Sequence, residues 1–240
     1  MVPMHSPIVD KLLKTNKLSL GEIFTKTGRV YSFLNPVSYL EALKNKNLFL
    51  SLDGLFSDGS ILVFFINLFY LSRITRRSFD MTSLAAETFN YAVNNNKSVY
   101  FIGSRQEQVE SAVQIFKSSY PQLNVVGYRN GYLKSEEEQI AEAKHICELN
   151  PDFLIVGLGI VRQEKFLLLV KDMGFRGVGL SCGGFLHQTA ENKINYYPKW
   201  IDKLNVRFLY RMIVEKHTRK RYLKAAFVFP VKFIKERLSL

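Results

Sequence analysis

Two Asp-Gly pairs lie close together in the segment S-L-D-G-L-F-S-D-G-S, where Asp53 precedes Gly54 and Asp58 precedes Gly59. A carboxylate in such a loop can act as a general base, which takes the proton from a hydroxyl group as that group attacks an electrophilic carbon. It can also stabilise positive charge that develops on a reacting carbon. Asp is equally a favoured N-cap residue, so Asp58 could instead cap a helix beginning near Ile61. From the residues alone, capping is the commoner use. For Asp53 we favour a structural role.

Glycines and polar residues recur directly after short apolar runs further along the chain. Glycine at the end of a strand lets backbone N–H groups approach a phosphate, and the N-terminus of the next helix favours the negative charge. Several such loops at one sheet edge predict a nucleotide pocket. The loop residues expected to bind substrate are Gly103, Ser104, Arg129, Asn130, Gly157, Gly159, Arg162, Gln163, Gly184 and His187. Gly157-Leu158-Gly159 lacks the complete G-x-G-x-x-G spacing, which argues against a nicotinamide cofactor.

Short apolar or β-branched runs alternate with amphipathic stretches, which predicts an α/β fold with a Rossmann-like parallel sheet and helices on both faces. The expected strands are Val30–Phe33, Leu48–Ser51, Ser98–Ile102, Asn124–Val126, Phe153–Val156 and Gly177–Leu180. The expected helices are Pro36–Asn45, Ile61–Leu71, Met81–Asn95, Gln106–Ser118, Ser135–Leu149, Gln163–Asp172, Val206–Lys216 and Arg219–Phe229. Ser135 and Glu138 form a capping-box pattern. Ligands of such sheets bind outside the carboxyl ends of the strands, which points to the loops that carry the candidate residues.

The net charge of +12 is concentrated at the end of the chain. From Lys199 to Leu240 there are 12 Lys and Arg residues against three acidic ones, and the first 198 residues hold 21 against 18. The composition also changes near Pro198, so we predict a catalytic α/β domain over 1–195 and a basic helical appendage over 196–240. A basic terminus seeks phosphate, on lipid or on nucleic acid.

Several classes of protein are disfavoured by the sequence. The two cysteines, Cys147 and Cys182, form no C-x-x-C pair and the four histidines are scattered, so neither a disulfide framework nor a metal site is expected. The first residues lack the apolar core of a signal peptide, which with the cysteine usage favours the cytoplasm. The apolar runs Ile61–Leu71 and Ala225–Ile234 are shorter than the ~20 residues that a spanning helix needs.

The order of the motifs resembles the WecG/TagA/CpsF family of bacterial glycosyltransferases, glycosyltransferase family twenty-six. The series runs D-G, F-I-G-S, Y-P-x-L-x-V-V-G-x-x-x-G-Y, V-G-L-G-x-x-x-Q-E-K, G-G-F, P-K-W and F-L-Y-R-M, from about Ser32 to Tyr222. The resemblance implies inverting transfer of a sugar, often N-acetylmannosamine or a related hexose, from a UDP-sugar to a sugar on a polyprenyl diphosphate. Such products are intermediates of capsule, teichoic acid or other surface polysaccharide. No metal or other cofactor is implied.

The resemblance also implies roles for single residues. Asp58 matches the family's presumed general base, and this reverses the preference for capping. Gln163 matches the glutamine of a P-K-Q-E motif, although Val161-Arg162 replace Pro-Lys. Asn35, with Ser32 in the place of a threonine, matches an early substrate-binding signature, although Asn35 could equally be a turn residue before Pro36.

Three departures from the family pattern put the donor sugar in doubt, and one of them is Val206-Arg207-Phe208 in place of Leu-Glu-Trp. His187 stands near a position where many members have an aspartate, and a lone histidine is more often structural. Thr218 replaces the first arginine of a later pair, with Arg219 next to it.

The basic appendage interleaves arginines with phenylalanines, which favours docking to the anionic inner face of the cell membrane as a peripheral protein. Arg211, Arg219 and Arg221 are the candidates for contacts with the lipid or the acceptor diphosphate. The alternative is a solvated basic helix that packs back on the domain. A nucleotide-dependent oxidoreductase and a non-catalytic nucleic-acid-binding protein are the rival functions. Neither has a supporting motif, so no nucleic-acid partner is expected. A homo-oligomer is compatible with the sequence.

Overall fold

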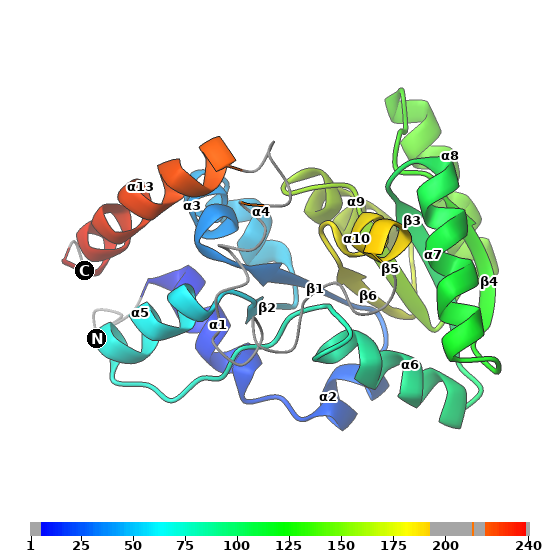
Figure 1. Ribbon diagram of the computed structural model, residues 1–240, viewed down its shortest axis with the longest axis horizontal. Helices are drawn as coiled ribbons and strands as arrows, with labels where there is room; N and C mark the ends of the chain where they lie inside the picture. Colours follow the sequence, from blue (N-terminus) through cyan, green and yellow to red (C-terminus); the bar gives the residue numbers. More distant parts are fainter. Residues whose placement is uncertain (1–5, 193–212, 214–218, 239–240) are drawn as a thin grey trace.

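The centre of the protein is a six-stranded sheet in which every adjacent pair of strands is parallel (Figure 1). The computed structural model describes residues 6–192, 213 and 219–238. The strands are β1 (Arg29–Leu34), β2 (Gly54–Ser57), β3 (Ser98–Gly103), β4 (Asn124–Arg129), β5 (Phe153–Gly157) and β6 (Val178–Ser181). They lie in the order β2-β1-β6-β5-β3-β4. The predicted α/β fold with a parallel sheet is confirmed.

Helices cover both faces of the sheet, because side chains alternate along each strand and both sets are apolar. In β1, Val30 and Leu34 join one core cluster while Tyr31 and Phe33 join the other. The helices that pack into the first cluster are α1 (Pro7–Asn16), α3 (Pro36–Lys44), α4 (Lys46–Ser51), α5 (Ser60–Tyr70), α8 (Glu136–Leu149), α9 (Arg162–Asp172) and α13 (Arg219–Leu238). Those that pack into the second are α2 (Leu20–Thr25), α6 (Leu84–Asn94), α7 (Gln106–Ser119) and α10 (Phe185–Asn192).

The strand predicted at Leu48–Ser51 is wrong, because these residues form helix α4 and the second strand is Gly54–Ser57. A short run of Leu and Phe fits either element, and leucine is a good helix former. Gly54 begins this strand, paired with Tyr31 of β1, and a glycine is needed there because α1 crosses closely: a Cβ would lie 2.7 Å from the Thr15 side chain. Asp53 therefore stands at the amino end of β2, and only Asp58 follows its carboxyl end.

Other boundaries also differ from the sequence predictions. Helices α1 and α2 were not predicted, and β4 continues to Arg129, so that Arg129 lies in a strand and not in the following loop. Ser135 does cap α8, since its hydroxyl accepts from the Glu138 N–H. The Glu138 carboxylate, however, accepts from the Lys134 N–H. Only half of the capping box is thus formed.

The C-terminal helix α13 packs back onto the sheet domain. Phe229 and Phe233 make ring contacts with Tyr39 of α3 and with Phe65 of α5, and Tyr39 donates to the Glu236 carboxylate at 2.8 Å. The helix runs through Pro230 and nine residues past the predicted end at Phe229. Most of the predicted helix Val206–Lys216 and the predicted boundary near 195 lie outside the described residues, so the division into two domains stays a prediction.

Candidate active site

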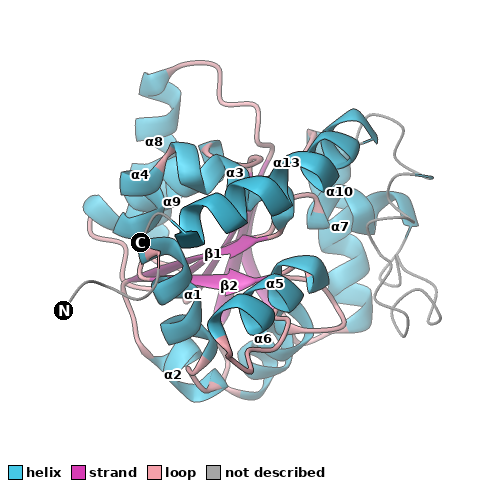
Figure 2. Cartoon of the chain, turned by 90° about the vertical axis from the view of Figure 1, so that its left-hand side faces the viewer, coloured by secondary structure: helices cyan, strands magenta, loops and turns pink. Residues whose placement is uncertain are grey.

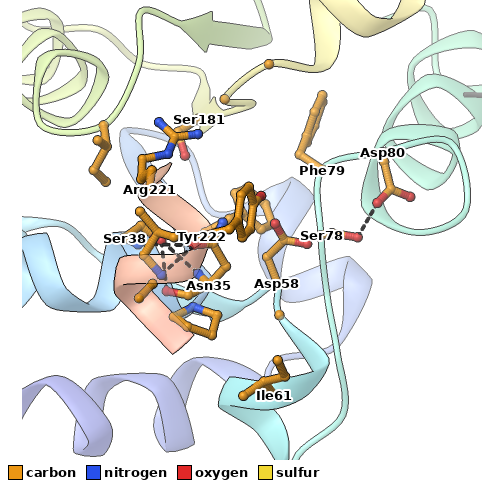
Figure 3. A pocket seen from close by; sticks show the side chains of 18 of the residues that line it. Asn35, Ser38, Asp58, Ile61, Ser78, Phe79, Asp80, Ser181, Arg221 and Tyr222 are labelled. Atoms are coloured by element: carbon orange, nitrogen blue, oxygen red, sulfur yellow. Dashed lines mark hydrogen bonds between the residues drawn. The ribbon is translucent and has the colours of Figure 1, made fainter. Parts of the chain in front are cut away.

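A cavity of about 590 Å³ opens at the carboxyl ends of β1, β2 and β6, and the start of α13 forms one of its walls. Seven of the predicted site residues line it: Asn35, Asp58, Gly159, Gln163, Gly184, His187 and Arg221. Figure 3 shows Asp58 between the Asn35–Ser38 turn and the segment carrying Ser78 and Asp80, with Arg221 and Tyr222 entering from α13. Chain segments far apart in sequence therefore meet around one carboxylate.

Asp58 is placed by the strand that precedes it. Its backbone N–H donates to the Leu34 carbonyl at 2.8 Å, so the residue continues the pairing of β2 with β1. Its side chain is one-third exposed, at 33%. The N-cap of α5 is Gly59 and not Asp58. The capping alternative is therefore wrong for the N-cap position itself, and the carboxylate lies in the wall of the cavity.

Arg76 is a site residue that the sequence predictions missed. Its Nε donates to the Asp58 carbonyl at 2.7 Å, and one terminal nitrogen lies 3.4 Å from Asp58 Oδ1. The same nitrogen donates to Ser78 Oγ at 2.5 Å and to Asp80 Oδ2 at 2.7 Å. One guanidinium thus joins the catalytic candidate to a second carboxylate in the cavity. These residues belong to an extended segment between α5 and α6. They follow no strand and have no glycine beside them. The expectation that site residues follow strand ends therefore does not include them.

Asn35 combines the two roles that the sequence left open. Its Oδ1 accepts from the N–H groups of Val37 and Ser38, and the Ser38 hydroxyl accepts from the Asn35 N–H, which completes a capping box at the start of α3. The side chain also lines the cavity. Because the carbonyl oxygen serves the cap, the amide NH₂ is the group that can donate to a substrate.

A buried polar network lies behind the cavity. Ser32 does not line the cavity but donates to Glu164 Oε1 at 2.6 Å and lies 2.9 Å from the Ser181 hydroxyl. Gln163 donates to the same Glu164 oxygen at 2.8 Å and accepts from the Gly183 N–H at 3.3 Å. Burial raises the pKa of Glu164, against the hydrogen bonds from Ser32 and Gln163, which lower it. The network fixes Gln163, and with it the loop that begins at Gly183.

The glycines predicted for phosphate binding lie where the strand order reverses. β3 connects outward to β4 whereas β5 connects inward to β6, so the loops after β3 and β5 diverge at this point. A Cβ on Gly103 would lie 2.6 Å from the Gly157 carbonyl oxygen, and one on Gly131 would lie 3.0 Å from Gly103 Cα. These glycines therefore serve close packing of backbones. Gly159, with a φ of 81°, carries the loop from there into the cavity.

Ser104, Asn130 and Arg162 lie near these glycines and outside the cavity. The Ser104 carbonyl accepts from the Gly131 N–H, and the Asn130 side chain bonds Gln106 and the Tyr132 N–H. Arg162 lies 3.4 Å from the Gly131 carbonyl. The glycine turns at the ends of β3, β4 and β5 thus form one polar rim beside the cavity.

Arg129 is held by acidic residues of α8. Its guanidinium pairs with Glu138 and, at 2.6 Å, with Glu142, which also accepts from the Tyr100 hydroxyl. All these contacts lie outside the cavity lining. The structure thus places Arg129 in a helix-to-sheet ion pair.

The remaining candidates stand on α10 and α13. The His187 Nδ1 lies 2.8 Å from the Gln108 amide nitrogen, and Nε2 lies 3.4 Å from Glu191, so the ring is held by two neighbours while it faces the cavity. Arg221 is exposed at the cavity wall. Arg219 donates to the Ile213 carbonyl at 3.1 Å and is not part of the lining. Arg211 lies outside the described residues.

Asp53 lies at the opposite end of β2 from Asp58. Its carboxylate pairs with Arg29 at 2.6 Å and with Lys171 at 2.7 Å, and it accepts from the Val30 N–H. Burial alone would raise the pKa of Asp53, but the hydrogen bonds from Lys171, Arg29 and Val30 together lower it. The structural role predicted for Asp53 thus has a clear physical basis.

We expect Asp53→Asn to lower the free energy of unfolding by about 1–3 kcal/mol at pH 7 and to leave catalysis intact. Because the folded state depresses the pKa, this stability is present above the unfolded value of about 3.9 and is lost as the pH falls below it. Urea unfolding at pH 7 and near pH 3 measures the difference in free energy of unfolding between the wild type and Asp53→Asn. This difference should be smaller at the lower pH. A constant difference would contradict the ionic origin.

The arrangement suits displacement at an electrophilic carbon by a hydroxyl group. A carboxylate stands in the cavity wall, arginines stand on two sides of it, and two glycines of the lining, Gly159 and Gly183, face open space where a Cβ would meet no atom within 4 Å. Within residues 6–192, 213 and 219–238, no group of three or more His, Cys, Asp or Glu side chains is placed to hold a metal ion.

Comparison with known proteins agrees with this chemistry. Residues 11–240 match the glycosyl transferase WecG/TagA/CpsF family. The chain is 33% identical over 234 residues to the UDP-Gal:alpha-D-GlcNAc-diphosphoundecaprenol beta-1,4-galactosyltransferase of Shigella boydii, an alignment that covers 98% of this chain and 94% of that protein. It is 28% identical over 202 residues to the N-acetylglucosaminyldiphosphoundecaprenol N-acetyl-beta-D-mannosaminyltransferase of Bacillus subtilis (strain 168), with 82% and 76% covered. The sequence and the fold agree: this chain is a glycosyltransferase and belongs to the WecG/TagA/CpsF family.

Proposed function

We propose that the protein transfers a hexose or N-acetylhexosamine from a UDP-sugar to N-acetylglucosamine on a polyprenyl diphosphate, in the synthesis of a cell-surface polysaccharide. The observation that carries this is the cavity itself. It joins the Asp58 carboxylate, Arg221 of α13 and the apolar side chains Ile61 and Leu223 in one space. A sugar, a diphosphate and the start of a lipid chain need these three environments. The named relatives from Shigella boydii and Bacillus subtilis act on such acceptors.

In this mechanism Asp58 takes the proton of the acceptor hydroxyl while the hydroxyl oxygen attacks the anomeric carbon of the donor. The bond from that carbon to the phosphate oxygen breaks, and UDP leaves with the electron pair. A single displacement inverts the anomeric configuration, and the β-linkages in the relatives' names support this outcome for α-linked donors. Arg76 holds Asp58 in place through its contacts with the carbonyl and with the carboxylate.

The UDP diphosphate would lie at the glycine turns between Gly157 and Gly159, next to the cavity, where strand ends and the start of α9 favour phosphate. Arg162, at the first turn of α9, can supply a positive charge there. With arginines available for this task, we propose that no metal ion is required.

The enzyme would work as a peripheral protein on the anionic inner face of the cell membrane. No helix among the described residues has the length and apolarity needed to cross a bilayer. The exposed lysines and arginines of α13, between Arg219 and Lys235, can bind anionic head groups at about 1 kcal/mol each. The relatives act on undecaprenol-linked substrates, which reside in a membrane.

A donor screen tests the proposal. Purified full-length protein is mixed with a short-chain lipid-diphosphate N-acetylglucosamine acceptor and a panel of UDP-sugars, beginning with UDP-galactose and UDP-N-acetylmannosamine. Release of UDP is followed with and without a chelator. Acceptor-dependent release from one donor, unaffected by the chelator, is the expected result. Release that needs no acceptor, or none from any donor with folded protein, would contradict the proposal.

Arg221→Ala should raise the KM for the acceptor and lower kcat/KM by about tenfold to a hundredfold, because a charge-assisted bond to the diphosphate is lost. kcat should change little, since Arg221 binds a part of the acceptor that does not react. Steady-state kinetics with the soluble short-chain acceptor measure both constants. Lys117→Ala on α7, an exposed basic residue outside the cavity, is the matched control. An unchanged KM in Arg221→Ala would remove this residue from the acceptor site.

A further inference from the structure

Helix α5, which follows Asp58 directly, exposes an apolar stripe. Phe64 is 60% exposed and Leu68 is 54% exposed, and they continue the line of Ile61 at helical spacing. The opposite side, with Leu62 and Ile66, is buried in the core. The sequence of the helix, S-I-L-V-F-F-I-N-L-F-Y, has no charged residue. A helix at a water-exposed surface normally carries polar residues on its outer side. The outer side of α5 is therefore suited to an apolar environment.

The residue that ends α5 is unusual in two independent ways. Leu71 lies in the left-handed region, with φ 49° and ψ 38°, where glycine or asparagine commonly ends a helix. A leucine is strained there, because its Cβ crowds the backbone. It is also 91% exposed, so packing against the described part of the chain does not offset that strain. A leucine that helps neither the backbone nor the core indicates a use for its side chain outside the molecule.

Helix α13 lies beside α5 and has a matching outer surface. Phe65 and Phe69 of α5 contact Phe233 of α13, so an aromatic seam joins the two helices. Both lie on the face that Figure 2 turns toward the viewer. The outer side of α13 exposes three apolar residues at four-residue spacing, Leu223, Phe227 and Val231. Phe227 is 78% exposed. The two apolar stripes thus belong to neighbouring helices.

Basic side chains accompany this double stripe. Exposed basic residues include Arg73 just beyond α5, and Arg219, Lys220, Arg221, Lys224, Lys232 and Lys235 on α13. Apolar residues flanked by lysine and arginine suit the boundary between anionic head groups and acyl chains. In a symmetric contact with a second copy, the same positive charges would face one another and repel. The charge therefore favours an anionic lipid surface over a dimer.

We propose that α5 and α13 insert together into one anionic leaflet, so that the catalytic domain itself, through Phe64, Leu68 and Leu71, supplies part of the membrane contact. The inference rests on the proposed function, in which the acceptor is lipid-linked. It adds a geometric consequence. The stripes begin at Ile61 and Leu223, which line the cavity, so insertion brings the mouth of the cavity to the head groups. Asp58, three residues before Ile61, then stands at the depth where a lipid-linked diphosphate sugar presents its hydroxyl.

Co-sedimentation with vesicles tests the proposal on the full-length protein without substrates. Vesicles of phosphatidylglycerol and phosphatidylcholine are compared with vesicles of phosphatidylcholine alone. We expect the double variant Phe64→Ser, Leu68→Ser to bind the anionic vesicles at least about tenfold more weakly than the wild type. The reason is that two large apolar side chains no longer leave water on binding. Leu149→Ser, on α8 at the other end of the sheet, is the matched control and should bind as the wild type does (Figure 1).

Leu71→Gly separates the proposed role from a structural one. Glycine relieves the left-handed strain, so the thermal midpoint without vesicles should rise, while binding to anionic vesicles should fall several-fold. Asn150→Gly relieves the same conformation at the end of α8 and should leave vesicle binding unchanged. A higher midpoint with undiminished binding would overturn the proposal.

The same variants also test whether this surface is a contact between copies of the chain. If the α5 variants bind vesicles like the wild type but change a dimer into a monomer in sedimentation equilibrium, the surface is a contact between copies and the proposal is wrong. Because vesicle binding is measured without donor or acceptor, its result is independent of the donor screen. Failure of the screen with intact, α5-dependent vesicle binding would refute the enzymatic proposal alone.

Discussion

Asp58→Asn is expected to lower kcat by about 10²–10⁴ while the protein stays folded. Asparagine has the same shape as aspartate and can keep the contact with Arg76, but it cannot accept the proton of the acceptor hydroxyl. The backbone bond from Asp58 to the Leu34 carbonyl does not involve the side chain, so the end of β2 should be preserved. Turnover of the donor identified by the screen, together with a thermal midpoint, measures both properties.

Asp80 provides the comparison that makes this result specific. It also lines the cavity, and its carboxylate binds Arg76, Ser78 and Thr82. Asp80→Asn should lower stability and reduce turnover moderately, because it loosens Arg76 without removing the base. If Asp80→Asn abolished turnover and Asp58→Asn retained it, the base would be Asp80. Asp53→Asn, at the amino end of β2, controls for the loss of a partly buried carboxylate.

The two Asp-Gly pairs show how far the sequence could define the site. Both pairs look like loop residues, and the error at Leu48–Ser51 placed them in one loop after a strand. The structure separates them, because β2 begins at Gly54 and ends at Ser57. The resemblance to a family singled out Asp58, which the structure places in the cavity wall, but it gave no information about Asp53. The distinction depends on which side of a four-residue strand each pair occupies, and no local pattern shows this.

The glycines were predictable as positions of close backbone approach, but their partners were not. Gly103 approaches both Gly157 and Gly131, although the three glycines end β3, end β5 and follow β4. The predicted alternation of strands and helices placed all three at one edge. Which glycines adjoin the cavity depends on strand order, and the order β2-β1-β6-β5-β3-β4 cannot be read from alternation alone.

Charged residues were the hardest to assign. Arg129 follows a strand-like run and was expected in a binding loop, yet two glutamates of α8 hold it. Arg76 follows no strand and was overlooked, yet it contacts Asp58. An arginine takes its role from the carboxylates that tertiary structure brings within reach. For Arg129 these carboxylates belong to α8, and for Arg76 they belong to the end of β2 and to the residue four positions later.

Arg76→Ala is the second substitution from which we expect a large effect, a loss of about 10²-fold in kcat. Its guanidinium fixes the Asp58 carbonyl through Nε and binds Asp58 Oδ1, Ser78 and Asp80 through one terminal nitrogen. Without it the Asp58 and Asp80 carboxylates would lose the cation that they share. The segment between α5 and α6 would also lose its hydrogen bond to the Asp58 carbonyl. The free energy of unfolding should fall by about 1–3 kcal/mol as well.

Arg76→Lys distinguishes charge from geometry at this position. A lysine restores the positive charge but offers a single ammonium group, which cannot bind the Asp58 carbonyl and Asp80 in the same way. We therefore expect partial recovery of stability and a kcat still well below that of the wild type, with a KM for the donor that changes less than kcat. Arg77→Lys is the matched control, since Arg77 lies outside the cavity lining and donates to the Leu18 carbonyl. Full recovery of kcat in Arg76→Lys would mean that charge alone suffices. A folded Arg76→Ala protein with normal kcat would show that Asp58 needs no such partner, because the strand end alone would then hold it in place.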